Sequence, residues 1–309
     1  MLKITYLDAL TLGDTPLDAI SALGELTTWP GSTPEEAVRR VSDCDVLIVN
    51  KVRVTRELLA AAPRLSLVCE AATGVDNIDL EACAERGIKV RNVAGYSTES
   101  VVQETWMHIL SLAGNGPYYD GRVKDGAYSA SGLFTDLSGN ITELDGKVIG
   151  IIGMGKIGHR VAEIAVAFGM KAVYYSTSGT SHCEDYPSLP LEELLGISDI
   201  VSIHAPLNGR TRGLIGRREL EMMKPTAFLV NMGRGGIVDE AALAEAIDGE
   251  TIAGAALDVF SEEPLPLSSP LLHVSRPERF RFTPHTAWAS AAARARLVEA
   301  IASNIRSSF

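Results

Sequence analysis

The chain has 309 residues, enough for about two domains, and its 46% hydrophobic and 22% charged residues are typical of a globular protein. Its net charge of −11 at pH 7 argues against binding to the phosphate backbone of nucleic acids, which requires clustered Lys and Arg. No apolar run approaches the roughly 20 residues that cross a bilayer, and the first one ends at Asp8, too early for a signal peptide. The cysteines lack metal-ligand spacing, so we expect reduced thiols in a cytoplasmic protein without a metal site: Cys44, Cys69, Cys83 and Cys183.

Short apolar runs near the N-terminus predict strands at residues 4–7, 46–49, 64–70 and 87–93, with helical patterns between and after them. Strands that alternate with helices imply a parallel sheet covered by helices. This first part of the chain contains no glycine triplet that would bind phosphate.

A predicted helix at residues 99–113 follows, with apolar residues at helical spacing and a Gly-Asn-Gly-Pro sequence at its end. We interpret this helix as the connection between two domains. Residues 118–140 are polar, rich in glycine and serine and without a clear period, which predicts a loop rather than a short helix.

A glycine-rich turn comes next, after a strand predicted at residues 148–152. The motif Gly153-x-Gly155-x-x-Gly158 lies between this apolar, β-branched strand and a helix predicted at 159–168. In that setting Gly153 permits the tight turn, Gly155 lets the backbone approach a pyrophosphate, and Gly158 lets the helix pack close to the strand. The helix N-terminus offers free N–H groups to the phosphates. The motif therefore predicts a dinucleotide site.

The rest of the chain repeats the alternation of strands and helices. Because ligands of open parallel sheets bind beyond the carboxyl ends of the strands, the polar residues directly after each strand are the candidates for chemistry. The predicted helices lie at 191–195, 240–247 and 289–305, and the predicted strands at 171–175, 199–204, 227–231, 254–260 and 280–283.

Three of these strand ends carry side chains suited to a keto acid. Arg234, in a glycine-rich loop, suits bidentate capture of a carboxylate, although a surface ion pair is the simpler explanation of a lone arginine. Glu263 and His285 follow the next two strands, and an imidazole oriented by a carboxylate is a general acid or base near neutral pH. With a nicotinamide supplying hydride, the three groups provide a carboxylate anchor, a proton donor and a group that tunes the donor.

The remaining histidines carry less information. His204 ends a strand beside the predicted cofactor, so we expect it to line the nicotinamide pocket. The other four have no partner pattern and are expected to be structural or surface groups: His108, His159, His182 and His273.

Five motifs, in order along essentially the whole chain, resemble those of the D-isomer-specific 2-hydroxyacid dehydrogenases. They are Thr-Gly-Val-Asp-Asn-Ile-Asp at 73–79, the glycine turn at 153–158, Asn-Met-Gly-Arg-Gly at 231–235, Leu-Asp-Val-Phe-Ser-Glu-Glu-Pro at 257–264 and Thr-Pro-His at 283–285. Within the family, the sequences at 50–51, 93–98 and 284–288 look most like the glycerate dehydrogenase (hydroxypyruvate reductase) branch.

The resemblance implies an α/β fold of two Rossmann-like, doubly wound parallel-sheet domains. A flavodoxin-like substrate domain would comprise residues 1–97 and 286–309, an inserted NAD(P)-binding domain would comprise residues 98–285, and catalysis would take place in the cleft. It also implies a small 2-keto acid or D-2-hydroxy acid as substrate, hydroxypyruvate/glycerate or glyoxylate/glycolate first. The expected assembly is a homodimer through the cofactor domain, with 118–140 as its arm.

The family's roles are transferred residue by residue. Arg234 would bind the substrate carboxylate and polarise the carbonyl, His285 would donate the proton in reduction, and Glu263, which the following proline favours over Glu262, would pair with His285. The expected substrate contacts are Asn50, Lys51, the N–H groups of Thr73 and Gly74, Arg234, His285 and Trp288. The expected cofactor contacts are Thr98, Gly153, Gly155, Lys156, Ile157, Gly158, Ser176, Thr177, His204, Ala205, Pro206, Thr211, Met232, Gly233, Arg234 and Asp258.

The sequence leaves the cofactor open between NAD and NADP. Where NAD-specific members carry an acidic residue for the ribose 2′-hydroxyl, this chain has Ser176, with neither an acid that would repel a 2′-phosphate nor a nearby Arg or Lys that would pair with it. Met232 stands where a smaller or hydroxylated residue is usual, so we expect a tighter pocket wall.

Two other functions share these motifs. One is a dinucleotide-sensing binding protein similar to the transcriptional corepressors of this scaffold, and the acidic charge and the lack of a disordered partner-binding tail argue against it. The other is a dehydrogenase of formate or phosphite. An assay with 2-keto acids and with those donors discriminates among the three.

Overall fold

The computed structural model describes residues 1–309, which divide into two compact units. One unit comprises Met1–Ser97 and Trp288–Phe309, and the other comprises Thr98–Ala287. The chain re-enters the first unit two residues later than we expected, because the N–H groups of Thr286 and Ala287 donate hydrogen bonds to Asp258 in the second unit.

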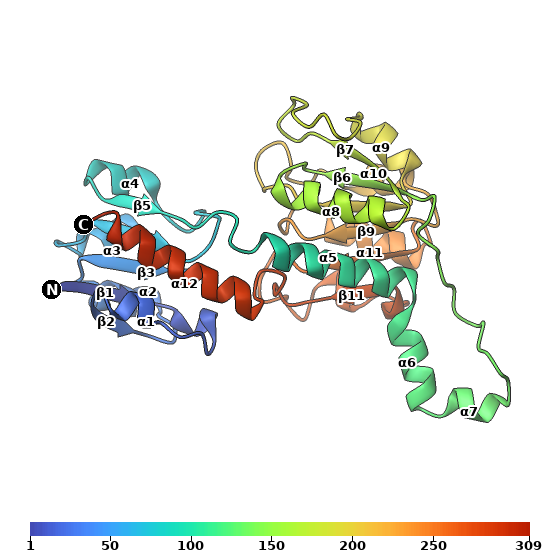
Figure 1. Cartoon of the computed structure of the whole chain (residues 1–309), viewed down its shortest axis with the longest axis horizontal. Coiled ribbons are helices and arrows are strands. Elements are labelled where there is room, and N and C mark those ends of the chain that lie inside the picture. Colours follow the sequence, from blue (N-terminus) through green and yellow to red (C-terminus); the bar gives the residue numbers. More distant parts are fainter. The chain divides into compact units, whose positions relative to one another are not determined.

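The first unit is a five-stranded parallel sheet in the order β2-β1-β3-β4-β5 (Figure 1). The apolar runs give fully buried β3 and β4, as expected for strands covered on both faces. The strands are β1 (Leu2–Tyr6), β2 (Gly24–Thr28), β3 (Val46–Val49), β4 (Leu67–Glu70) and β5 (Lys89–Arg91).

Two helical layers cover this sheet. The 3-10 helix η1 (Ala9–Leu12), α1 (Asp18–Ser21) and α12 (Ala291–Arg306) pack on one face, and α2 (Pro34–Arg40), α3 (Arg56–Ala60) and α4 (Leu80–Glu85) pack on the other. The prediction missed β2, because its Gly-Glu-Leu-Thr-Thr sequence lies at the sheet edge and lacks an apolar run.

The second unit is a six-stranded parallel sheet in the order β11-β10-β9-β8-β6-β7. The chain leaves β6 toward β7 on one side and then crosses to β8 on the other, so the topological switch point lies between β6 and β8. The strands are β6 (Val148–Ile152), β7 (Lys171–Tyr175), β8 (Ile200–Ile203), β9 (Phe228–Asn231), β10 (Gly254–Leu257) and β11 (Phe280–Phe282).

Alternate residues of β6 enter different cores. Ile149 and Ile151 pack with α5 (Thr98–Ala113) and α8 (Lys156–Ala167), and Ile152 packs with the layer of α9, α10 and α11. That opposite layer comprises α9 (Leu191–Ile197), α10 (Arg217–Met222), which the prediction missed, α11 (Glu240–Asp248) and the 3-10 helix η2 (Pro270–Leu272). The 3-10 helix η3 (Pro277–Arg279) leads directly into β11. The two doubly wound sheets confirm the predicted fold class.

Residues 116–141 form an extension of the second unit. We expected a loop at 118–140, but the segment contains two short helices, α6 (Gly116–Lys124) and α7 (Ala127–Ser131), which bury no residue and therefore leave no apolar period in the sequence. In Figure 1 they lie outside the layers that cover the sheet. No helix in the structure meets the length and apolarity that a membrane span requires.

Candidate active site

The glycine turn after β6 is shaped by two close approaches and one open position. Gly153 has φ +96°, and a Cβ there would lie 2.9 Å from the backbone nitrogen of Ala205. A Cβ on Gly158 would lie 2.4 Å from the carbonyl oxygen of Gly153, whereas one on Gly155 would meet no atom within 4 Å. Gly153 and Gly158 are therefore required for packing, and the space above Gly155 is free for a ligand.

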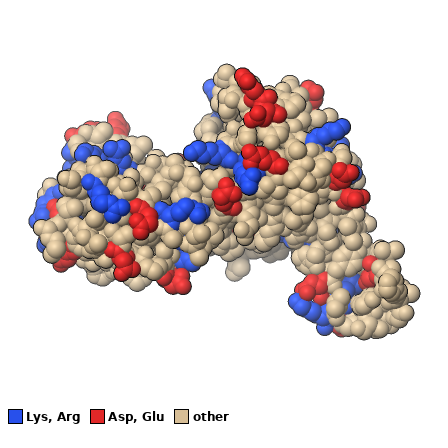
Figure 2. All heavy atoms as spheres, in the orientation of Figure 1, with Lys and Arg blue, Asp and Glu red and all other residues tan.

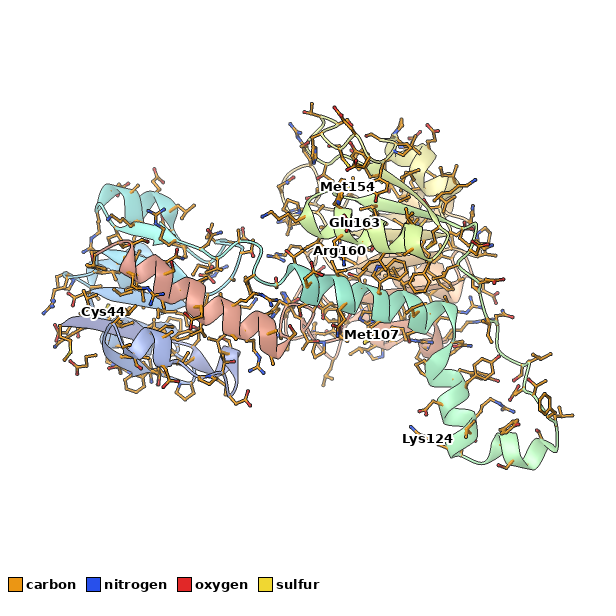
Figure 3. All side chains as sticks on the ribbon, in the orientation of Figure 1. Cys44, Met107, Lys124, Met154, Arg160 and Glu163 are labelled. Atoms are coloured by element: carbon orange, nitrogen blue, oxygen red, sulfur yellow. The ribbon has the colours of Figure 1, made fainter.

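This free space lies at the N-terminus of α8. Gly155 is the N-cap and supplies no side-chain hydrogen bond, and the first turn contains Lys156 and no acidic residue. The unpaired N–H groups and the helix dipole favour an anion at this end. Figure 3 labels Met154 in the turn, and Arg160 and Glu163 further along α8, where the last two form an ion pair at 2.7 Å. The residues fit the pyrophosphate of a dinucleotide.

Beyond β8, on the other side of the switch point, His204 is held as a neutral ring. Its Nε2 lies 2.8 Å from the Ser202 hydroxyl, its Nδ1 is buried without a partner, and burial lowers the pKa of His204 to about 3. Thr211, an expected cofactor contact, is fully buried, and its hydroxyl donates to the Pro206 carbonyl at 2.6 Å. Thr211 therefore fixes the turn that follows Ala205.

At the end of β9, Asn231 shapes the loop that carries Arg234. The Asn231 side chain accepts from the N–H of Gly233 at 3.0 Å and donates to the carbonyl of Arg234 at 3.0 Å. Arg234 is partly buried, donates through Nη1 to the Gly233 carbonyl at 2.9 Å, and has no ion pair with an acidic side chain. Most of its five donors remain available for an oxyanion.

The ends of β10 and β11 bring Glu263 and His285 together. The Nδ1 of His285 lies 2.7 Å from Oε2 of Glu263, whose Oε1 accepts from the N–H of Phe260 at 3.0 Å. Because the carboxylate accepts the Nδ1 proton, Nε2 is the nitrogen that can exchange a proton with a ligand. Glu262 is exposed and forms no such contact. Arg234, Glu263 and His285 thus follow three neighbouring strands, β9, β10 and β11.

A buried aspartate holds the loop that carries His285. Asp258 is 1% exposed, and its carboxylate accepts from the Thr283 hydroxyl at 2.7 Å and from the N–H groups of Thr286 at 2.8 Å and Ala287 at 3.0 Å. These bonds bracket His285, whose φ of +56° is unusual for a residue other than glycine. We expected Asp258 to contact the cofactor; in the structure its carboxylate is occupied within the protein. Burial raises the pKa of Asp258.

His108 extends this network, although its sequence pattern suggested no partner. It is buried in α5, and its Nε2 lies 3.0 Å from the Thr283 hydroxyl, which itself donates to Asp258. Burial lowers the pKa of His108 to about 4, so the ring is neutral near pH 7. No local pattern indicates this contact, because 175 residues separate the two partners.

The end of β7 carries Ser176 and Thr177. The Ser176 hydroxyl is buried and donates to the Thr180 carbonyl at 2.6 Å, which closes the loop. Thr177 is half-buried and its side chain forms no hydrogen bond. The remaining expected cofactor contacts divide by burial: Lys156 and Pro206 are exposed, Thr98 and Ile157 are half-buried, and Ala205, Met232 and Gly233 are buried.

In the first unit, the loop that contains Asn50 and Lys51 is held by Asp8. The Asp8 carboxylate accepts from the N–H groups of Asn50 at 3.0 Å, Lys51 at 2.6 Å and Val52 at 2.9 Å. Asn77 clamps the same loop from the other side, because its Nδ2 lies 3.3 Å from the Asn50 carbonyl, 3.1 Å from that of Val52 and 2.9 Å from the Glu70 carboxyl. The sequence reasoning missed these supports, although Asn77 lies within a motif that it singled out.

The neighbouring loop presents the N–H groups of Thr73 and Gly74. Neither donates a hydrogen bond within the protein, while the Thr73 hydroxyl donates to the Val93 carbonyl at 3.1 Å and so fixes the loop. Trp288 lies in the same unit, with its ring 6.3 Å from that of Tyr96 in an edge-on contact. Two free N–H groups side by side can donate hydrogen bonds to an anionic oxygen.

Acidic and basic side chains are interspersed on the surface (Figure 2). On the face drawn in Figure 2, Lys and Arg side chains alternate with Asp and Glu, and no continuous basic tract forms. Several of these cations are engaged in ion pairs, including Arg217 with Glu245 and Arg218 with Glu192.

Known proteins share both the sequence and the fold. Residues 106–287 match the family model of the D-isomer specific 2-hydroxyacid dehydrogenase NAD binding domain. The chain is 40% identical over 300 residues to a glyoxylate reductase of Aeropyrum pernix, covering 94% of this chain and 88% of the relative. It is 32% identical over 311 residues to a hydroxypyruvate reductase of Blautia hydrogenotrophica, covering 98% and 96%.

Two solved structures with bound dinucleotides have the same architecture. An acyclic imino acid reductase in complex with NADPH and D-Arg superposes with a TM-score of 0.88 at 29% identity, covering 99% of this chain and 96% of that one. A D-lactate dehydrogenase from Aquifex aeolicus, complexed with NAD and lactic acid, superposes with a TM-score of 0.85 at 28% identity, covering 99% and 94%. The chain therefore belongs to the family of D-isomer specific 2-hydroxyacid dehydrogenases, NAD(P)-dependent oxidoreductases that act on the CH–OH group of their donors.

Proposed function

We propose that this protein reduces a small 2-keto acid, hydroxypyruvate or glyoxylate, to the D-2-hydroxy acid, with Arg234, Glu263 and His285 as its catalytic residues. The observation that carries the proposal is the arrangement of an unpaired arginine and a carboxylate-bound histidine on three adjacent strand ends of the sheet that also bears the glycine turn. The choice of substrate is supported by relatives named glyoxylate reductase and hydroxypyruvate reductase.

Each residue has a separate task in the proposed reaction. The dinucleotide, when bound, supplies the hydride that reduces the keto carbon. Arg234 binds the substrate carboxylate and polarises the carbonyl through its free N–H groups. His285 donates the Nε2 proton to the carbonyl oxygen as it becomes a hydroxyl, and takes a proton from the hydroxyl in the reverse direction. Glu263 stabilises the protonated ring and holds its orientation through Nδ1.

Groups of the first unit complete the proposal for the substrate. We assign the free N–H groups of Thr73 and Gly74 to an oxygen of the substrate carboxylate, and Asn50, Lys51 and Trp288 to selectivity among keto acids. Asp8 and Asn77 then act as positioning residues for the loop that carries Asn50 and Lys51. The cytoplasm is the proposed location, on the basis of four free cysteines.

The test is a panel of 2-keto acids assayed with NADH and NADPH in parallel, together with two variants. His285→Ala should lower kcat by about 10²- to 10⁴-fold and retain cofactor binding, because it removes only the proton donor. Arg234→Ala should raise KM for the keto acid. If the purified protein oxidises neither cofactor with any member of the panel, the proposed activity is wrong.

The same assay separates the two other functions. Turnover with formate or phosphite as donor, and none with keto acids, would indicate the other class of dehydrogenase. Dinucleotide binding without any turnover, together with a protein partner whose affinity changes with NADH, would indicate a sensing protein.

We propose that the extension at 116–141 is the arm of a homodimer formed through the cofactor domain. Its large apolar side chains support this, since Phe134 is 96% and Leu137 81% exposed. Figure 3 labels Lys124 at the end of α6, where the extension turns toward α7. Sedimentation equilibrium should give the mass of two chains for the wild type and one chain for a Phe134→Ser, Leu137→Ser variant; a monomeric wild type would refute the proposal.

A further inference from the structure

The loop after β7 lacks the groups that hold an unphosphorylated ribose. The loop begins with Ser176, Thr177, Ser178, Gly179 and Thr180, and none of these five residues is acidic. Glu184 and Asp185 follow later in the loop, where Asp185 is paired with His159. The Ser176 hydroxyl donates to the Thr180 carbonyl at 2.6 Å and lies 3.0 Å from the Ser178 hydroxyl. Its one proton is therefore used within the loop, and it cannot replace a carboxylate that accepts from both ribose hydroxyls.

Arg210, from the turn after β8, packs against this same loop. Its Nη1 donates to the carbonyl of Ser178, which lies 32 residues away in the chain. Gly179 makes room for the contact, since a Cβ there would lie 3.2 Å from Nη1 and its φ of +83° disfavours any side chain. The turn itself is anchored, because the N–H of Arg210 donates to the Asn208 side chain at 2.9 Å and Thr211 is bonded to Pro206.

The guanidinium retains most of its binding capacity. No Asp or Glu forms an ion pair with Arg210, and only one of its five N–H donors is used by the Ser178 carbonyl. The loop and the turn follow β7 and β8, the strands on either side of β6 and its glycine turn. A cation at this place is thus beside the position where the adenosine ribose of a dinucleotide lies in doubly wound folds.

We infer that Arg210 binds the 2′-phosphate of NADP(H) and makes this protein prefer the phosphorylated dinucleotide. The inference rests on the proposed function only in requiring a dinucleotide at the glycine turn. A dianionic phosphate gains charge-assisted hydrogen bonds from the guanidinium and from the free Thr177 hydroxyl, and none of residues 176–180 is acidic. The expected preference for the 2′-phosphate is about ten- to hundred-fold in affinity.

The experiment measures binding without turnover. Calorimetric titrations compare 2′-phospho-ADP-ribose with ADP-ribose for the wild type, Arg210→Gln and Arg212→Gln. Arg212 is the matched control, because it is another exposed arginine of the same turn, and its guanidinium lies toward Gly236. We expect the wild type and Arg212→Gln to bind 2′-phospho-ADP-ribose at least about ten-fold more tightly than ADP-ribose. Arg210→Gln should bind the two ligands equally.

Three results would overturn the inference. Equal affinity of the wild type for the two ligands would show that the 2′-phosphate is not recognised. A preference that survives in Arg210→Gln would place the recognition elsewhere, and an equal loss in both variants would indicate only the general charge of the turn. If the wild type binds neither ligand, the dinucleotide site fails as a whole and the inference fails with it, whereas equal binding leaves the proposed reductase activity intact.

Discussion

Glu70 provides a prediction that joins stability to the loops of the proposed substrate site. Its side chain is fully buried at the end of β4, where Oε2 accepts from Asn77 at 2.9 Å and Oε1 has no partner. Asn77 in turn holds the carbonyls of Asn50 and Val52. Replacing Glu70 by Gln keeps an acceptor for Asn77 and removes the only ionisable group at this position.

The size of the effect follows from the pKa of Glu70. Burial raises this pKa from 4.5 to about 8, so the folded state keeps a proton that the unfolded chain releases. The stabilisation is complete below about pH 4.5 and is lost as the pH rises through about 8. At about 1.4 kcal/mol per pH unit, the free energy of unfolding contributed by Glu70 falls by about 3–4 kcal/mol between about pH 5 and 8.

Urea unfolding of the wild type and Glu70→Gln at a series of pH values measures this contribution. The difference in free energy of unfolding, wild type minus variant, should fall by about 3–4 kcal/mol over that range, because the variant has no proton to lose. Glu57→Gln is the control, since it removes an exposed carboxylate of the same unit. If the difference in free energy of unfolding between wild type and Glu70→Gln does not change with pH, the conclusion that Glu70 is protonated in the folded state is wrong.

Other predictions concern the second unit. Gly153→Ala should lower Tm and abolish ADP-ribose binding, because a Cβ would lie 2.9 Å from Ala205 at a φ of +96°, whereas Gly155→Ala should keep the wild-type Tm and lose only the binding. A normal Tm for the first variant, in thermal denaturation, would contradict this. In Asp258→Asn the new NH2 group would point at a backbone N–H that now donates to the carboxylate, so two donors would oppose each other. The substitution should cost about 1–3 kcal/mol of stability and lower kcat more than it lowers ADP-ribose affinity. An unchanged kcat would contradict a positioning role. Arg234→Lys should raise KM for the keto acid about ten-fold or more while retaining charge, because the planar fork is lost; an unchanged KM in steady-state kinetics would contradict bidentate capture.

Much of the second unit could be read from local sequence. The apolar run at 148–152, the glycine spacing and the periodic helix predict β6, its turn and α8, because each depends on residues within a few positions of one another. The same reasoning missed β2, whose edge position requires only partial burial, and α10, which is short. The strand-end rule and the family motifs singled out Arg234, Glu263 and His285, and the structure brings the last two to 2.7 Å.

By itself, the sequence predicted two parallel-sheet domains and the glycine turn, and it singled out Arg234, Glu263 and His285 as candidates for chemistry. The tertiary structure decided how those residues are supported and which charges meet. Asp258 turned out to hold the His285 loop, His108 to contact Thr283, and Arg210 to reach the loop that contains Ser178, each across 25 to 175 residues of chain. The physical reason is that strand and helix formation depends on neighbours in sequence, whereas a hydrogen-bond partner and the degree of burial depend on which distant segments pack together. Only the folded chain therefore places the Arg210 cation against the loop that contains Ser178.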